Sequence, residues 1–416
     1  MYDIIIIGAG VSGIFTALSL AETTKKVLLL EAGPNLQERK NEHTFDGFGG
    51  LGISEGKYNY SSEFGGNLVE KIGLEQTKIS LKQVRKLLEK FGGEESLIYQ
   101  TNPPALQVQD FHFIKNTTQH LGRKLSKEVY QNFFDYLKTK ITIQTDQKVD
   151  QISPFENIYQ VKTQENTIFY GKKIVVAVGQ ANHFLTQVRK TLHLTAENTR
   201  IDLGLRLEMP QQQWKKLLGN QQEIKFTYKN FYSHCMNKSG RVISQEQKGF
   251  LRPDGQNFRE NGASENLNFS LFHPFYFENE KQANLSIQHL FSLFNKNGKI
   301  IGQRLSELDS TFPATTNVEA TLPYQPHSLK KVVPQKIIQG TLACLKNLEN
   351  LLGEKISGNT VLYACDAKFY PTAVQTNAHF ESSAKNIYFT GDCSGISWSL
   401  SHAAAAGLYL GEFLAK

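Results

Sequence analysis

Four isoleucines in a row follow Asp3 at the start of the chain. Such a β-branched run predicts a strand that is buried on both faces of a parallel sheet. A glycine-rich turn at 8–13 and an expected helix follow, and a second apolar run at 27–30 ends in Glu31. Together these segments predict one strand–helix–strand unit.

A glycine-rich stretch at 44–66 comes next, and its interleaved Phe45, Phe48, Leu51 and Ile53 predict a packed loop rather than a flexible linker. Helical spacing then predicts a helix that starts at a capping box of Ser80 and Gln83 and stops at Gly92, and a second helix at 126–139. Short apolar or alternating runs predict strands at 141–143, 149–152, 159–163 and 173–179.

Residues 183–345 differ in composition and pattern: they are rich in Asn, Gln and aromatic residues and contain short alternating runs such as 201–207 and 268–272. They predict an inserted, mixed and mostly antiparallel α+β domain that binds the substrate. Residues 1–182 and 346–416 are expected to form one Rossmann-like α/β domain from both ends of the chain. Its last part is predicted as a strand at 386–390, a turn at 391–395 and a small-residue helix at 397–414.

The turn after the first strand has the spacing Gly8-x-Gly10-x-x-Gly13. Gly8 permits the tight turn, Gly10 lets a pyrophosphate approach the backbone, and Gly13 allows close packing of helix on strand. The helix N-terminus offers N–H groups and partial positive charge to the phosphates, and Glu31 is placed to accept hydrogen bonds from ribose hydroxyls. A dinucleotide site is predicted; the alternative is a glycine turn of no function.

A second motif near the end of the chain distinguishes FAD from NAD. Asp392, in the segment 390–395, follows a strand and is placed to bind a ribitol hydroxyl, while the next helix directs its N-terminus at the flavin. The alternative is an ordinary Gly-Asp turn. The strand at 173–179 ends in the small residues expected beside adenosine, where Val149 would meet the adenine through its backbone.

These motifs and the loop between them yield a set of expected FAD-binding residues. The set is Gly8, Gly10, Val11, Ser12, Gly13, Glu31, Ala32, Gly33, Gly49, Gly50, Leu51, Gly52, Val149, Ala177, Gly179, Gly391, Asp392, Gly395, Ile396 and Ser397.

The chain resembles the superfamily with the glutathione-reductase-type FAD fold. More narrowly, it resembles the bacterial FAD-dependent dehydrogenase family of NAD(P)/FAD-dependent oxidoreductases. The resemblance is carried by 8–13 with Glu31, 47–52 with Ser54 and 56–57, 120–122, 202–206, 235–236 with Gly240, and 391–395. It implies that the loop at 47–57 lies along the flavin and pyrophosphate. The chain departs from it in starting directly at the first strand, where members often carry an extra domain, and in Ser-Trp-Ser at 397–399.

Four side chains are candidates for chemistry. Lys57 could favour an anionic reduced flavin, Cys235 could lie in a substrate pocket, His402 could donate a proton and Arg206 could bind a substrate carboxylate. Each has a structural alternative: a surface lysine, a packed thiol, a helix-packing histidine and a buried ion pair. The flavin itself carries the redox chemistry, so a catalytic side chain is not obligatory.

The predicted function is an FAD-dependent oxidoreductase, a dehydrogenase or reductase that transfers hydride or electrons between an organic small molecule and FAD. The sequence from 183 to 345 has no second Gly-x-Gly-x-x-Gly after a strand, so NAD(P)H would dock transiently, or a protein electron carrier would serve. The alternatives are a flavin monooxygenase or halogenase, a prenyl-lipid saturase, and, from another class, a flavin-binding sensor or an RNA-associated accessory protein.

Charge and cysteine usage change this picture little. The net charge of +7 comes from scattered basic pairs, which are typical of solvated faces and give weak support to a nucleic-acid or acidic-carrier surface. The four cysteines stand far apart, so neither a metal site nor a disulfide framework is expected. The sequence has no signal peptide and no apolar run long enough to span a membrane, and a cytoplasmic location is expected.

Overall fold

The computed structural model describes residues 1–40, 46–104, 108–247, 249–257, 262–296 and 298–416. The chain divides into two compact units, the first made of 1–99, 116–199 and 370–416 and the second of 100–115 and 200–369. The boundaries expected at 182/183 and 345/346 thus fall at 199/200 and 369/370 instead. Helix α5 (Asn182–Thr191) stays with the first unit because it packs against its strand β8 (Val149–Phe155), and β20 (Val361–Phe369) pairs with β11 (Thr199–Pro210) of the second.

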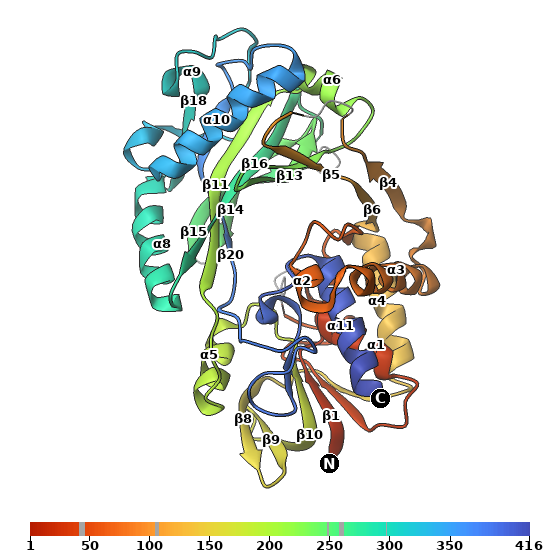
Figure 1. Cartoon of the computed structure of the whole chain (residues 1–416). Helices are drawn as coiled ribbons and strands as arrows, with labels where there is room; N and C mark the ends of the chain where they lie inside the picture. The colour runs from red at the N-terminus through yellow and green to blue at the C-terminus, as the bar shows by residue number, and fades with distance from the viewer. Residues whose placement is uncertain (41–45, 105–107, 248, 258–261, 297) are drawn as a thin grey trace. The chain divides into compact units, whose positions relative to one another are not determined.

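The first unit is built on a seven-stranded sheet in the order β7-β2-β1-β10-β9-β8, with β21 paired to β10 (Figure 1). The strands around β1 are parallel, whereas β9 is added antiparallel to β10 and β8 is added antiparallel to β9. The remaining strand bounds are β1 (Tyr2–Ile7), β2 (Val27–Leu30), β7 (Thr142–Gln144), β9 (Ile158–Thr163), β10 (Ile168–Val176) and β21 (Ile387–Phe389).

The helices of the first unit share one apolar core with side chains of β1, β2 and β10. Their bounds are α1 (Val11–Leu20), α2 (Leu68–Ile72), α3 (Leu74–Lys90), α4 (Gly122–Leu137) and α11 (Leu400–Ala415), with short 3-10 turns η1 (Gly50–Ile53), η2 (Gly93–Glu95) and η5 (Gly391–Ser394). A small sheet, β3 (Lys57–Asn59), β6 (Asn116–His120) and β4 (Leu97–Thr101), completes this part.

The small residues of α11 explain its contact with α1. A Cβ on Gly407 would lie 2.3 Å from the Ser12 carbonyl oxygen, so only glycine allows the two helices to approach this closely. The helix was expected from 397, but it begins at Leu400, where the Ser399 side chain caps it by accepting from the His402 N–H.

The predicted capping box at Ser80 and Gln83 is wrong. Helix α3 already begins at Leu74, after Gly73, so Ser80 lies in the helix interior and is fully buried. The helix predicted at 126–139 likewise begins earlier, at Gly122. In both cases the local signal lay within a helix that tertiary packing extends toward its N-terminus.

The second unit is a mixed, mostly antiparallel nine-stranded sheet in the order β17-β18-β20-β11-β16-β13-β12-β5, with β19 paired to β18, so the predicted fold class is confirmed. Its other bounds are β5 (Phe111–Ile114), β12 (Lys225–Tyr228), β13 (Phe231–Lys238), β14 (Arg241–Gln247), β15 (Phe250–Gln256), β16 (Asn266–Phe277), β17 (Asn295–Lys296), β18 (Lys299–Arg304), β19 (Gln325–Pro326), η3 (Gln211–Trp214), α6 (Lys215–Leu218), α8 (Glu280–Phe294), α9 (Leu305–Leu308), η4 (Leu329–Lys331) and α10 (Gln335–Leu352).

The two faces of this sheet differ sharply in chemistry. Leu203, Leu205 and Leu207 of β11 join an apolar core that includes side chains of α8 and α10. The alternating residues Asp202 and Arg206 point the other way, because side chains along a strand alternate between faces. We call this second side the polar face and define it by Asp202, Arg206, Tyr232, Asn268, Ser270, Phe272, Asp366 and Lys368.

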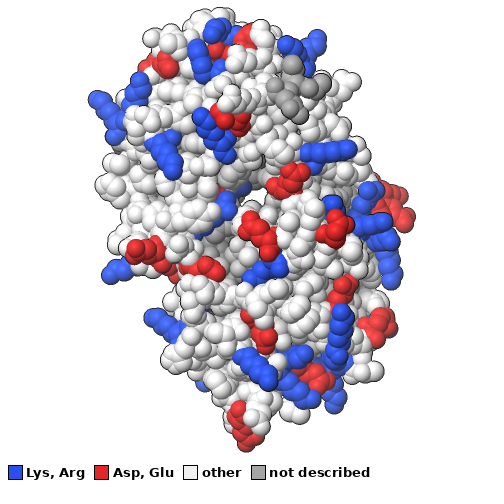
Figure 2. All heavy atoms as spheres, viewed as in Figure 1, with Lys and Arg blue, Asp and Glu red and all other residues white. Residues whose placement is uncertain are grey.

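On the face drawn in Figure 2, charged side chains are spread out rather than gathered, and Lys and Arg are interspersed with Asp and Glu. Within the described ranges, no helix has the length and apolar character required to cross a membrane.

Candidate functional site

Three loops meet at one edge of the first unit's sheet. They follow β1, β10 and β21, three neighbouring parallel strands whose ends are level, since Ile7 pairs with Val176 and Val176 with Phe389. β2, which follows β1 in the chain, lies on one side of β1, and β10, which comes much later, lies on the other. Such a switch point at the carboxyl ends of parallel strands is where open α/β sheets bind ligands.

The glycines of the first loop are fixed by close backbone contacts. Gly8 has φ +102°, and a Cβ on it would lie 2.5 Å from the Ala177 carbonyl oxygen. A Cβ on Gly13 would lie 1.9 Å from the Gly8 oxygen. Gly10 is different: a Cβ there would meet no atom within 4 Å, and this residue caps the N-terminus of α1. The loop therefore presents an open space at the helix N-terminus, the arrangement that accepts a pyrophosphate.

Glu31 ties the strand ends and loops together. Its carboxylate accepts the backbone N–H groups of Ala9 at 2.7 Å, Gly33 at 2.9 Å and Gly47 at 3.0 Å, and the residue is 6% exposed. Two carboxylate oxygens offer about four acceptor positions. Glu31 was expected to accept from ribose hydroxyls; the structure shows that its first task is to organise three backbone segments, with one acceptor position left for a hydroxyl.

The loop at 47–53 packs on the first glycine turn. The Gly49 N–H donates to the Ala9 carbonyl oxygen at 2.8 Å, and a Cβ on Gly50 would lie 3.1 Å from the Gly10 Cα. Gly52 instead serves packing, because its Cβ position is 2.1 Å from the Tyr130 hydroxyl. The packed-loop prediction holds for the buried Phe48 but not for Leu51, which is 37% exposed.

Phe45, also expected in that packed loop, lies outside the described residues, which resume at Asp46.

Asp392 lies in η5, directly after β21. Its carboxylate accepts from the Gln180 amide at 3.3 Å, and burial raises its pKa from 3.8 to about 6, a shift that this hydrogen bond opposes. Gly391, with φ +77°, leaves room for the Ser12 side chain, which lies 2.4 Å from its Cβ position, and Gly395, with φ +68°, does the same for Ala373. The loop after β21 is thereby fixed against the start of α1.

Three buried polar atoms around this loop have no hydrogen-bond partner among the described residues: Thr390 Oγ1, Ser397 Oγ and His402 Nδ1. The opposite ring nitrogen of His402, Nε2, lies 2.9 Å from the Ser61 carbonyl oxygen. Burial lowers the pKa of this histidine, which favours the neutral ring. Unpartnered buried polar groups are costly, so these three atoms are available for hydrogen bonds with a polar ligand or with water.

The adenosine side of the expected site lies around Glu31 and Val149. The Gln147 N–H donates to the Glu31 carbonyl oxygen at 2.8 Å, and the Asp146 N–H donates to the Gly33 oxygen at 2.9 Å, so the segment between β7 and β8 runs beside the end of β2. At the end of β10, Gly179 has φ +57° and open space at its Cβ position.

The remaining expected FAD-binding residues lie within these same segments. Val11, Ser12, Ala32, Ala177 and Ile396 belong to the start of α1 or to loops at the sheet edge, and of these Ala32 alone is exposed. Sequence reasoning missed Gln180 and the hydroxyl of Thr390. Gln180 follows Gly179 and Thr390 precedes Gly391, so both could have been found as neighbours of the predicted glycines.

The four catalytic candidates fall in two groups: Lys57 and His402 belong to the first unit, and Arg206 and Cys235 belong to the second. Lys57 pairs with His120 in the small sheet, and His402 lies in α11. Arg206 is fully buried on the polar face of the second unit, where it donates to the Cys235 carbonyl oxygen at 2.8 Å, to Ser270 and to Asn268. These contacts are hydrogen bonds within the sheet, so they give Arg206 a structural role. Cys235 itself is half-exposed.

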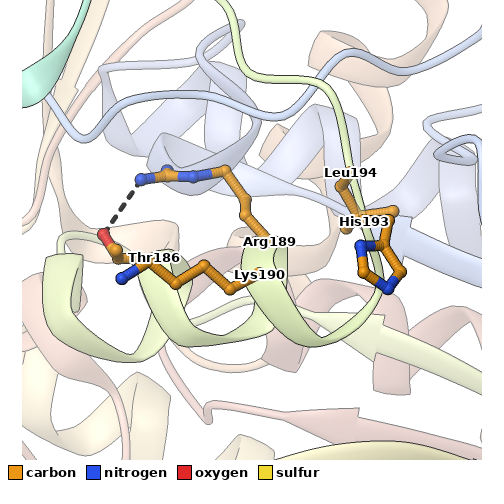
Figure 3. Close-up of a pocket in the computed structure, with 5 residues that line it drawn as sticks. All are labelled: Thr186, Arg189, Lys190, His193 and Leu194. Atoms are coloured by element: carbon orange, nitrogen blue, oxygen red, sulfur yellow. Dashed lines mark hydrogen bonds between the residues drawn. The ribbon is translucent and has the colours of Figure 1, made fainter.

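A separate hollow of about 480 Å³ lies on α5 and the residues after it (Figure 3). It is lined by Thr186, Arg189, Lys190, His193 and Leu194. Arg189 donates to the Thr186 hydroxyl at 2.9 Å and to the Thr372 carbonyl oxygen at 2.5 Å. The Arg189 guanidinium is thus bonded to the fold on one side of this hollow.

A glycine turn at a helix N-terminus, an acidic residue at the end of the next strand and a second polar loop near the C-terminus define a dinucleotide-binding flavoprotein. The family described as FAD binding domain matches residues 3–56, which contain β1, the glycine turn, Glu31 and the loop at 47–53. FAD is thus the cofactor, the chain is a flavoenzyme, and the predicted resemblance to FAD-dependent oxidoreductases is confirmed.

Other comparisons give distant likenesses. No curated protein matches the sequence. Among solved structures, NikD, an unusual amino acid oxidase essential for nikkomycin biosynthesis, has 11% identity over 100% of this chain and 93% of its own, with a TM-score of 0.41. p-Nitrophenol 4-monooxygenase PnpA from Pseudomonas putida DLL-E4 has 9% identity over 100% of this chain and 78% of its own, with a TM-score of 0.39. The Diels-Alderase PyrE3 has 10% identity over 98% of this chain and 63% of its own, with a TM-score of 0.39. This chain therefore spans less than two thirds of the length of PyrE3.

Asp392→Asn tests the electrostatics of the loop after β21. Because the pKa is raised on folding, the unfolded chain loses this proton first, and stability falls as the pH rises from about 4 to about 6. We expect the asparagine variant of the apoprotein to be more stable by about 1–3 kcal/mol above pH 6, with no difference below pH 4. Its FAD affinity should fall about tenfold, since a charged acceptor is lost. Urea unfolding across pH and FAD titration measure both.

Asp135→Asn is the matched control for that measurement. Lys138 lowers the pKa of Asp135, so any effect of this substitution has the opposite sign and stays small on the surface. A destabilised Asp392→Asn apoprotein at pH 7 would contradict the expectation and make the carboxylate a structural partner.

Proposed function

We propose that the protein is an FAD-dependent oxidoreductase of the dehydrogenase or reductase type, acting on a small organic substrate. One observation carries the proposal: the loops after β1, β10 and β21 converge at a level sheet edge with open space at Gly10 and unpartnered polar atoms beside Asp392. When bound, FAD supplies two-electron exchange with an organic substrate.

The residues of the first unit divide the work of holding that cofactor. Gly10 and the N-terminus of α1 would take the pyrophosphate, and the free acceptor position of Glu31 would take a ribose hydroxyl. Asp392 would accept from a ribitol hydroxyl. Ser397 Oγ and the neutral His402 ring offer further hydrogen bonds to polar groups of the cofactor.

Substrate binding is assigned to the second unit, whose polar face carries charged and aromatic side chains on a rigid sheet. The electron partner is either transiently docked NAD(P)H or a protein carrier, since residues 183–345 lack a second glycine fingerprint.

The test is an absorption spectrum of the purified protein before and after anaerobic addition of NADH, NADPH and dithionite. Flavin bands that bleach with a nicotinamide support the oxidoreductase and name its reductant. Bleaching by dithionite alone supports a protein carrier or a reducing substrate. A bound flavin that no donor or substrate ever reduces during turnover would overturn the proposal in favour of a sensor.

A further inference from the structure

The polar face of the second unit presents one lysine between two aromatic rings. Lys368 lies in β20 opposite Asp202 of β11. Its ammonium nitrogen is 5.2 Å from the ring centre of Tyr232 and 5.1 Å from that of Phe272. Lys368 and Tyr232 are half-buried, whereas Phe272 is fully buried. The side chain is therefore held on the sheet by cation–π contacts and remains reachable from solvent.

The neighbouring carboxylates are already engaged by other groups. Asp202 accepts from Arg200 at 2.7 and 3.0 Å and from the Tyr232 hydroxyl at 2.5 Å. Asp366 is paired with Arg252 at 3.1 Å and accepts from Ser270.

Lys368, in contrast, has no hydrogen bond and no ion pair within the described part of the chain. The carboxylates of Asp202 and Asp366 act on Lys368 from nearby, but each is already paired with an arginine, Arg200 or Arg252. A half-buried ammonium without a dedicated counter-ion attracts an anion, because burial strengthens the attraction.

We propose that Lys368 binds the carboxylate of an organic-acid substrate, whose carbon skeleton packs against the Tyr232 ring. This assignment rests on the proposed oxidoreductase function and specifies its substrate class. A single ammonium matches a singly charged carboxylate better than a phosphate dianion, which is usually bound by several donors or cations. The half-exposed Cys235 and His234 on β13 border the same place.

The surroundings of Lys368 also set the pH range of binding. Burial lowers its pKa to about 8, while Asp202, Asp366 and Cys235 oppose that shift. The other titratable or charged groups of the facing elements are Arg200, Arg206, Tyr232, His234, Arg252 and Asp254. Carboxylate binding should therefore be strong at pH 6–7 and weaken above about pH 8, as the ammonium loses its proton.

The experiment uses the FAD-loaded protein and a panel of probes: acetate, benzoate, phenylacetate and octanoate, each beside its neutral amide. Binding is measured by titration calorimetry and by the change in the flavin absorption bands. At least one acid should bind, and its amide should bind at least tenfold more weakly. Lys368→Met should weaken acid binding roughly ten- to a hundredfold, and Lys368→Arg should retain most of it.

Lys346 provides the matched control, since it also lies over an aromatic ring, 4.7 Å from the centre of Phe312, but is paired with Glu349 at 3.4 Å. Lys346→Met should leave acid binding unchanged. Circular dichroism and urea unfolding verify that each variant is folded.

Binding of no acid to the wild type, equal binding of acid and amide, or unchanged binding by Lys368→Met would overturn the inference. The two proposals fail separately. A flavin that substrates or donors reduce while no acid binds rejects the carboxylate site alone. Acid binding that depends on Lys368, in a protein whose flavin is never reduced, rejects the oxidoreductase alone.

Discussion

Gly10→Ala is expected to leave the apoprotein folded while FAD affinity falls about a hundredfold. A Cβ at this position meets no protein atom within 4 Å, and the residue has φ −76°, a conformation that alanine adopts freely. The same Cβ would occupy the space into which the pyrophosphate approaches the backbone at the start of α1. Fluorescence titration of the apoprotein with FAD measures the loss, which corresponds to about 2.7 kcal/mol.

Gly13→Ala is the informative comparison. It changes the same turn, but its expected effect is on the stability of the apoprotein, whereas that of Gly10→Ala is on FAD affinity. Its Cβ would lie 1.9 Å from the Gly8 carbonyl oxygen, so the helix and strand must separate. We expect the apoprotein to lose about 1–3 kcal/mol or more in urea unfolding. Wild-type FAD affinity in the Gly10 variant would show that the pyrophosphate does not lie against this turn.

Glu31→Ala should destabilise the apoprotein by about 3–5 kcal/mol. The substitution removes one buried carboxylate that accepts three backbone N–H groups, from Ala9, Gly33 and Gly47. Those donors are then left without partners, and the glycine turn, the end of β2 and the loop at 47–53 lose their common anchor. FAD affinity should fall as well, since all three segments border the site.

Urea unfolding of the apoprotein, without FAD, separates this structural effect from lost binding. Glu31→Gln should recover part of the stability, because one amide oxygen still accepts while the amide nitrogen opposes an N–H group. Glu38→Ala, an exposed glutamate in the following loop, should change stability by less than about 0.5 kcal/mol. If Glu31→Ala unfolds like the wild type, the three hydrogen bonds do not anchor the loops.

The FAD-binding segments could be predicted because their signals are local. The run of isoleucines, the glycine spacing and the acid at the end of β2 lie within the first 31 residues, and the observed β1, α1 and β2 follow that pattern. The strand at 173–179 was predicted too long at its end, since Ala177 and Gly179 belong to the loop that meets Gly8. That distinction depends on a contact between distant residues.

The polar face could not be predicted, because it exists only through pairing. Asp202 and Lys368 are brought opposite each other by β11 and β20, and Tyr232 and Phe272 by β13 and β16. The pattern at 361–369 alternates weakly, since nearly all of β20 is buried, and it therefore shows no clear polar side in the sequence. Helix α10 was a missed local signal: Ile338, Leu345 and Leu352 repeat at helical spacing.

The order in which the chain is made has a consequence for the cofactor. The Ser12 hydroxyl donates to the Thr390 carbonyl oxygen, across 378 residues of sequence, and α11 packs against α1 only after both exist. At ribosomal rates of about 5–20 residues per second, roughly 20 to 75 s separate the synthesis of these two halves. The nascent chain must hold its first strand and helix without their partner for that time. We therefore expect FAD to be captured after translation of Asp392, and the exposed β1–α1 unit to be the point at which chaperones act during biosynthesis.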